Sequence, residues 1–282
     1  MKKTRLIALI DFSLYSHALI ELASRWCEIA NAELLLVHST PVLVPAMASQ
    51  NTKDEVFESE KKEIISKLSK LTGEKVPSAV KVDYLVTNKD LLDILPEIVN
   101  QNDYNDFLLV GVKGTGMLKK ILIGSTATKI IEELNYPTIA LPSKLCATQD
   151  NKCNLLPEKL IVALSYKFPL NEAAFANFLT TYKGSIKKVE FMSVIQSDET
   201  EEMAGQYLNT LSEKYKNQVP VSYKIFNGKD VYNEIKEYVS REKDTLLVVQ
   251  KGSRSLKDQL FREFLINRIV HDGSMPLVII PQ

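Results

Sequence analysis

The same series of short apolar segments occurs twice along this chain of 282 residues. Longer, amphipathic stretches separate the segments in both copies. Short apolar runs that alternate with amphipathic stretches are typical of parallel β-strands joined by helices that cover both faces of the sheet. The matching pairs of segments are 6–11 and 160–165, 34–38 and 189–193, 84–90 and 223–230, 106–110 and 244–249, and 137–142 and 276–281.

This repeat predicts an α/β protein of two tandem, doubly wound domains, each with a five-stranded, mainly parallel sheet. We expect residues 1–143 to form the first domain and residues 157–282 the second. The predicted linker is 144–156, because this segment has neither helical nor strand periodicity and lies between two prolines. The second repeat is shorter, mainly because it lacks a counterpart of the segment around 41–60.

The amphipathic stretches predict four helices in each repeat. Ser13 is the expected N-cap of the first helix, and Asp90 and Asp230 are the expected N-caps of the third helix in each repeat. The predicted helices cover 14–30, 54–72, 90–101 and 125–135 in the first repeat, and 170–182, 198–216, 230–242 and 257–271 in the second.

The most distinctive motif follows the fourth predicted strand of the first repeat. Gly111 and Gly114 are followed by Gly124, with Ser125 and Thr126 opening the next helix. Glycine lets the backbone approach a ligand closely, and a helix start offers free N–H groups and the positive end of a dipole. Together these features favour a phosphate site. A Walker A loop and a dinucleotide fingerprint both have a different spacing of glycines.

A plainer interpretation stays open for the same residues. The glycines can serve only turns and helix caps, and Asp11, which follows the first strand, can serve only as a helix cap. Ligands of open α/β sheets nevertheless lie beyond the carboxyl ends of the strands. Asp11 and the loop from Gly111 both follow strands, so both can face such a crevice.

The spacing Gly-x2-Gly-x9-Gly-Ser resembles the nucleotide-binding motif of the universal stress protein family, and the two repeats resemble tandem copies of its domain. The resemblance implies the Rossmann-like fold of adenine nucleotide alpha hydrolases and an ATP, ADP or AMP site in the first repeat, with Mg²⁺ as an optional companion. It implies that Asp11, preceded by Leu9 and Ile10, contacts the adenine or ribose and that Ser39 contacts adenine through its backbone. It assigns the ribose and phosphates to Val110, Gly111, Gly114, Gly124, Ser125, Thr126 and Ala127.

The second repeat departs from this motif. Gly252 remains, but Arg262 and Glu263 stand where the first repeat has its third glycine and the following serine, and Ser165 replaces Asp11. A bulky side chain and a negative charge both oppose a phosphate at a helix start. We therefore expect nucleotide binding in the first repeat and not in the second.

Charge and composition argue against several other functions. The chain has 35 basic and 35 acidic residues, which gives no electrostatic support for a nucleic acid or an anionic membrane as partner. Its apolar runs are shorter than the roughly 18 residues of a membrane-spanning helix, and we expect a cytoplasmic protein. We find no His, Cys and Asp cluster with the spacing of a metal site, and no carboxylate pair placed as general acid and base.

The leading hypothesis is a tandem universal stress protein that binds an adenine nucleotide and regulates a stress response. The alternatives are a weak ATP hydrolase and an interaction module without nucleotide, in which segment 41–60 is a partner surface or lid. An unpaired apolar edge strand is a liability. We therefore expect the strands at 138–141 and 277–280 to pair within the chain as a pseudo-dimer; a homodimer through these edges is the other option, and the protein partner is unknown.

Overall fold

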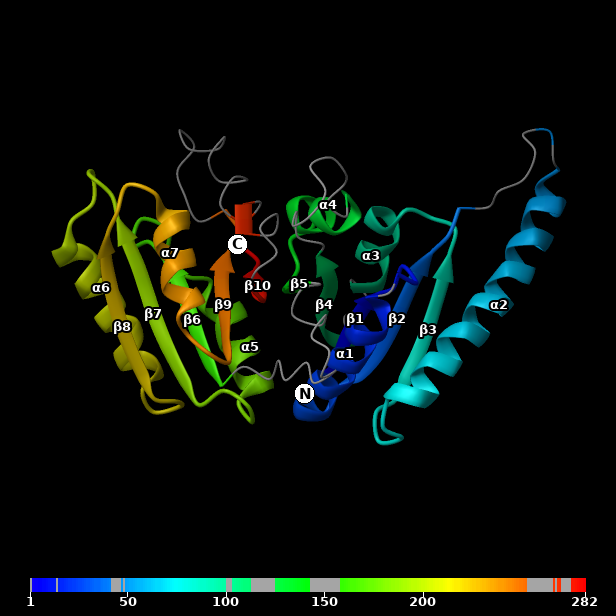
Figure 1. Cartoon of the computed structure of the whole chain (residues 1–282), viewed down its shortest axis with the longest axis horizontal. Coiled ribbons are helices and arrows are strands. Elements are labelled where there is room, and N and C mark those ends of the chain that lie inside the picture. Colours follow the sequence, from blue (N-terminus) through cyan, green and yellow to red (C-terminus); the bar gives the residue numbers. More distant parts are fainter. Residues whose placement is uncertain are drawn as a thin grey trace. The chain divides into compact units, whose positions relative to one another are not determined.

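The structure is a computed structural model of the whole chain (Figure 1). It describes residues 2–13, 15–41, 47, 49–99, 103–112, 125–142, 158–252, 266, 268–269 and 275–282. The predicted linker at 144–156 and most of the predicted helix at 257–271 lie outside these residues.

The chain divides into two compact units, Met1–Gly111 and Val112–Gln282. This division differs from the sequence repeat, whose first copy extends to about residue 142. The last helix and the last strand of the first repeat therefore belong to the same compact unit as the second repeat. Each unit is described separately below.

In the part of the first unit that the structure describes, three helices accompany a parallel sheet (Figure 1). Its strand order is β3-β2-β1-β4, and β1 pairs in parallel with both β2 and β4. The core lies between the sheet and α1, where Leu22 and Trp26 are each 1% exposed, as their helical spacing predicts. The elements are β1 (Lys3–Leu9), α1 (Ser16–Ala30), β2 (Glu33–Ser39), α2 (Gln50–Lys75), β3 (Val82–Thr87), α3 (Leu91–Val99) and β4 (Tyr104–Val112).

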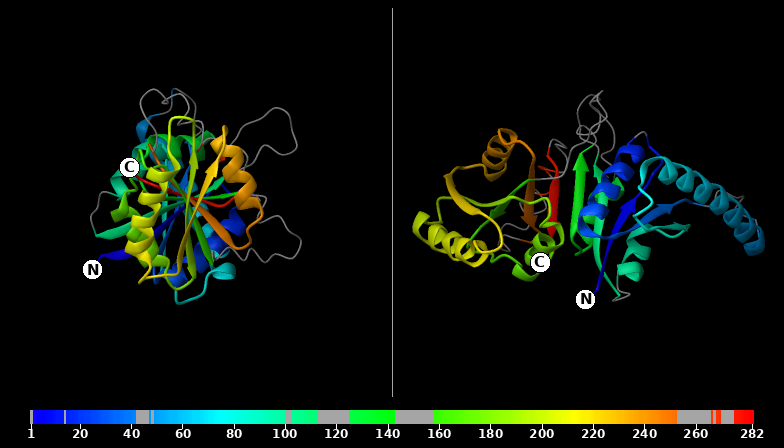
Figure 2. Two further views of the ribbon diagram at one scale, coloured as in Figure 1. Left: turned by 90° about the vertical axis from the view of Figure 1, so that its left-hand side faces the viewer. Right: turned by 90° about the horizontal axis from the view of Figure 1, so that it is seen from below.

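The second unit has the strand order β5-β10-β9-β6-β7-β8. Figure 2 shows α5 and α6 on one face of this sheet and α7 on the other, as expected for a doubly wound sheet. The elements are α4 (Ser125–Glu133), β5 (Thr138–Pro142), β6 (Lys159–Leu164), α5 (Glu172–Tyr182), β7 (Lys188–Ile195), α6 (Glu201–Tyr215), β8 (Val221–Asn227), α7 (Val231–Ser240), β9 (Thr245–Gln250) and β10 (Leu277–Ile280).

Within the described residues each repeat supplies five strands, so the predicted fold class is confirmed. Within the second unit, β5 and β10 pair antiparallel, with Leu277 opposite Ala140 and Ile279 opposite Thr138. These are the two apolar strands that the sequence marked as edges. Their pairing covers one side of each, so that β10 lies between β5 and β9.

The predicted helix starts are partly right. Asp90 accepts a hydrogen bond from the Leu92 N–H at 2.8 Å, and Asp230 accepts one from the Tyr232 N–H at 3.0 Å, so both aspartates cap as predicted. Ser13 was the wrong N-cap for the first helix, because α1 begins only at Ser16 and its N-cap residue makes no side-chain hydrogen bond. A turn intervenes, in which the carbonyl of Ser13 accepts the N–H of Ser16 at 2.9 Å.

The second predicted helix is longer than its sequence pattern indicated. The helix α2 begins at Gln50 and not at 54, since the Ser49 side chain caps it by accepting the N–H of Thr52 at 3.2 Å. Its counterpart α6 has 15 residues, against 26 in α2. Much of the extra sequence between β2 and β3 is therefore helix.

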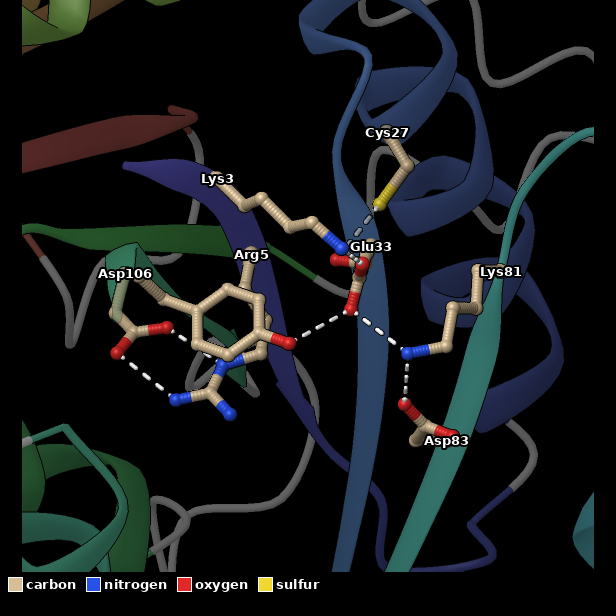
Figure 3. Close-up of polar contacts among 8 residues, drawn as sticks. Lys3, Arg5, Cys27, Glu33, Lys81, Asp83 and Asp106 are labelled. Carbon is tan, nitrogen blue, oxygen red and sulfur yellow. Dashed lines mark hydrogen bonds and ion pairs between the residues drawn. The ribbon is translucent and has the colours of Figure 1, made fainter. Parts of the chain in front are cut away.

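A group of charged side chains gathers at the amino ends of the strands in the first unit (Figure 3). Arg5 on β1 and Asp106 on β4 form a two-point ion pair, with nitrogen–oxygen distances of 2.7 and 3.0 Å. The Arg5 guanidinium also lies 4.1 Å from the ring centre of Tyr104 and donates to the carbonyl of Ile98 at 3.2 Å. The Asp106 side chain is only 3% exposed, so this ion pair belongs to the core.

Glu33 is the second centre of this group. Its carboxylate accepts hydrogen bonds from Lys3, Lys81 and Tyr104, each at 3.0 Å. The hydrogen bond from Lys3, reinforced by those from Lys81 and Tyr104, lowers the pKa of Glu33 from 4.5 to about 2. The charged form of Glu33 is therefore favoured by folding.

This shift predicts that Glu33 contributes to stability at neutral pH and loses that contribution in acid. A carboxyl group whose pKa falls on folding stabilises the protein above its unfolded pKa, and the stabilisation disappears as the pH falls from about 4.5 towards 2. We expect Glu33→Gln to be less stable than the native chain at pH 7 and nearly equal to it near pH 2. Urea unfolding at several pH values measures this difference. A difference that does not change with pH would contradict the assignment.

Candidate functional site

The carboxyl ends of β1 and β4 mark the point in the first unit where the strand order reverses. From β1 the chain continues to β2 on one side, whereas β4 lies on the other side of β1. Ala8 pairs with Leu109, and this register places Ile10 level with Gly111. Open α/β sheets bind ligands at such a switch in strand order. The structure therefore brings together Leu9, Ile10, Asp11, Val110 and Gly111, as the sequence predicts.

Asp11 opens the turn that leads from β1 to α1. Its side chain accepts hydrogen bonds from the Ser13 N–H at 3.0 Å and from the Ser16 hydroxyl at 3.1 Å. The next residue, Phe12, has a φ of 55°, an uncommon conformation for a residue other than glycine. Asp11 is an exposed residue, and its carboxylate organises the turn through these two hydrogen bonds.

The end of β2 lies beside this turn. The Nδ1 atom of His38 is 2.7 Å from the carbonyl oxygen of Ile10, and its ring meets the Phe12 ring edge-on at 4.8 Å between centres. His38 therefore joins the ends of β1 and β2, which is a structural role. Ser39 follows it, pairs with Thr87 on β3 and donates its hydroxyl proton to the Lys89 carbonyl at 2.7 Å.

The packing around position 111 explains why a glycine is needed there. A Cβ atom at this position would lie 2.6 Å from the ring of Tyr15, at the start of α1. Only a glycine lets β4 and Tyr15 approach this closely. Gly111 lies within β4, so it serves neither a turn nor a helix cap, and its small size is required by the packing of Tyr15. Sequence reasoning missed Tyr15 and Phe12, because no local pattern shows that an aromatic ring after a turn packs on a distant strand.

The remaining predicted site residues lie further along the chain. Gly114 and Gly124 fall outside the described residues. Ser125, Thr126 and Ala127 form the first turn of α4, which begins at Ser125 as predicted and ends at Glu133. Thr126 is exposed and Ala127 is half-buried. These three residues belong to the second compact unit, and their part in a nucleotide site stays a prediction of the sequence.

The corresponding strand ends of the second repeat are tied together by its own side chains. Gln250 is 6% exposed and bridges two backbone groups, because it accepts the Asn171 N–H at 2.5 Å and donates to the Pro169 carbonyl at 3.1 Å. Ser165, which replaces Asp11, donates to Glu199 at 2.9 Å. The polar groups at this edge therefore bond to one another, which fits the degenerate motif.

The described residues contain neither a candidate metal site nor a candidate membrane span. No three of their His, Cys, Asp and Glu side chains are grouped so as to hold a metal ion. None of the helices within those ranges combines the length and apolar character needed to cross a bilayer.

Comparisons with known proteins agree with this architecture. The model of the universal stress protein family matches residues 3–142. No curated protein matches the sequence. A universal stress protein from Archaeoglobus fulgidus DSM 4304 has a similar structure, with a TM-score of 0.69 and 14% identity over 100% of this chain and 99% of that chain. A functionally unknown protein from Pseudomonas aeruginosa PAO1 has a TM-score of 0.60 and 11% identity, over 99% of this chain and 93% of that chain.

The two structural similarities extend over both repeats, and at these identities they show the shared fold. The family match covers the repeat that carries the complete glycine motif. Through residues 3–142, the chain belongs to the universal stress protein family.

Proposed function

We propose that this protein is a cytoplasmic stress-response regulator that binds one adenine nucleotide, ATP or a close relative, through its first repeat. The proposed ligand includes the Mg²⁺ complex of ATP. Membership of the universal stress protein family supports the stress-response role. The nucleotide is our inference from the residues at the strand ends.

The observation that carries the proposal is the position of Asp11. It follows β1 where the strand order reverses, and the residue is exposed. A carboxylate at this place can accept hydrogen bonds from ribose hydroxyls or from the adenine amino group. Leu9 is half-buried and supplies apolar surface nearby, whereas Ile10 and Val110 are buried and offer the ligand their backbone groups, as Ser39 does from the end of β2.

The phosphates are assigned to the glycine loop and the first turn of α4 on the strength of the sequence motif. The free N–H groups of Ser125, Thr126 and Ala127 at a helix start suit the oxygens of a phosphate. We propose binding and not turnover, because the sequence offers no carboxylate pair placed as general acid and base. Release of phosphate, measured in the same samples, distinguishes the weak ATP hydrolase of the alternative hypothesis.

Isothermal titration with ATP, ADP and AMP tests the proposal. We expect one nucleotide per chain, because the strand ends of the second repeat are bonded to one another. Asp11→Ala should weaken binding about tenfold, as expected for the loss of one hydrogen bond to a charged group. Asp198→Ala is the matched control, since Asp198 is an exposed carboxylate beyond the end of β7 in the second repeat.

The control variant should bind as the native protein does. If the titration shows no heat of binding at nucleotide concentrations well above millimolar, the binding proposal is wrong. Two sites per chain would contradict its restriction to the first repeat. An Asp11→Ala variant with native affinity would remove Asp11 from the site.

A further inference from the structure

A lysine of the second repeat lies at the end of the last helix of the first repeat. The Nζ atom of Lys251 is 3.0 Å from the carbonyl oxygen of Leu134, the residue directly after α4. The last carbonyls of a helix have no partners within it, and a cation there interacts favourably with the helix dipole. Lys251 therefore satisfies a carbonyl that α4 itself leaves free.

Lys251 is half-buried, and two acidic residues lie close to it. Burial lowers the pKa of Lys251, and the carboxylates of Glu132 and Glu133 at the end of α4 oppose that change. The ammonium group is thus partly removed from water and lies near two acidic side chains. Its placement differs from that of a solvated surface lysine.

The last residues of the chain support the same turn. The Gln282 N–H donates to the Asn135 side chain at 3.1 Å, and the Lys251 N–H donates to the Ile280 carbonyl at 2.9 Å. Gly252 has a φ of +74°, and the Gln282 side chain occupies the space that a Cβ there would need. The segments that follow the carboxyl ends of β9 and β10 therefore each make one hydrogen bond to the turn between α4 and β5.

Lys251 belongs to the remnant of the glycine loop in the second repeat. When Gly252 is aligned with Gly114, Lys251 corresponds to Lys113. Its neighbour Gln250 is bonded within the second repeat, whereas Lys251 reaches a helix of the first repeat. The segment of the second repeat that corresponds to the glycine loop thus contacts the C-terminal end of α4. The first turn of this helix holds the last residues of the motif in the first repeat.

We propose that Lys251 is a positioning residue for the nucleotide site of the first repeat. This inference rests on the proposed function, because it takes the first turn of α4 as the part that binds phosphate. The helix has only nine residues, and helices this short depend on tertiary contacts for their stability. By holding the C-terminal end of α4, Lys251 orders the free N–H groups of its first turn before the ligand arrives. Ordering in advance reduces the free-energy cost of binding.

The test compares the ATP affinity of three variants with that of the native chain. Lys251→Met removes the charge and keeps the length of the side chain; we expect it to bind ATP about tenfold more weakly, or ~1.4 kcal/mol. Lys251→Arg should retain most of the native affinity, because it keeps a cation beside the Leu134 carbonyl. Lys187→Met is the control, since Lys187 is 69% exposed and paired with Glu158. Amide hydrogen exchange should be faster in α4 of Lys251→Met only.

The outcomes separate this inference from the proposed function. Native affinity in Lys251→Met would overturn the positioning role and leave nucleotide binding intact. An equal loss in Lys251→Met and Lys251→Arg would show that packing and not charge matters, and would also overturn it. No binding by the native chain would end both proposals. If Lys251→Met does not fold, Asn135→Ala removes the second link to the same turn, and native affinity in that variant would contradict the inference.

Discussion

Replacing Arg5 by methionine is expected to lower the free energy of unfolding by about 3–5 kcal/mol. The substitution leaves the carboxylate of Asp106 in the core, 3% exposed, without the guanidinium that holds both of its oxygens. A buried carboxylate that loses its cation must stay charged in a poor solvent or take up a proton, and both are unfavourable. Urea unfolding measures the loss. The chain has one tryptophan, Trp26, which is buried in the first unit and reports unfolding there.

Two further variants show whether the lost stability comes from the unpaired carboxylate of Asp106. Arg5→Met combined with Asp106→Leu should recover much of the stability, because a buried ion pair can often be replaced by apolar residues of similar size. Lys81→Met should cost far less than Arg5→Met, since this lysine is 59% exposed. A loss below about 1 kcal/mol for Arg5→Met alone would show that the ion pair does not hold β1 and β4 together as we infer.

Replacing Gly124 by arginine is expected to reduce ATP binding at least about a hundredfold. The second repeat carries Arg262 at the corresponding position, so the variant places the second repeat's residue in the first repeat. Under the proposed function a side chain at 124 occupies space that the phosphates need, and it blocks the N–H groups at the start of α4. Isothermal titration under the conditions used for the native chain measures the loss.

The matched control for this variant is Gly73→Arg. Gly73 lies in α2, where a Cβ would meet nothing within 4 Å, so the same change adds the same side chain in open space. We expect native affinity from this control. Equal affinities of Gly124→Arg and the native chain would remove the glycine loop from the site, even if Asp11→Ala still weakened binding.

The reverse change should not create a second site. Arg262→Gly restores one glycine, but Glu263 and Ser165 still differ from the first repeat, and the Gln250 side chain stays bonded to Asn171 and Pro169. We therefore expect the stoichiometry to remain one nucleotide per chain. This expectation follows from the position of Gln250, which the sequence motif does not reveal.

Part of the candidate site could be predicted from the sequence because it depends on local order along the chain. Asp11 directly follows β1, Ser39 ends β2, and Gly111 lies near the end of β4, and parallel strands bring such positions to one edge. The start of α4 at Ser125 was predicted for the same reason. The contact of Tyr15 with Gly111 and the bond between His38 and the Ile10 carbonyl required the packed structure.

The sequence by itself determined the repeated β-α order, the fold class and the capping roles of Asp90 and Asp230, since periodicity and capping depend on neighbours a few residues apart. Only the tertiary structure decided that Arg5 meets Asp106, that Tyr15 covers Gly111 and that Lys251 holds the end of α4. Each of these contacts joins residues far apart in the chain, and their distance and burial are set by how the elements pack. No local pattern in the sequence contains that information.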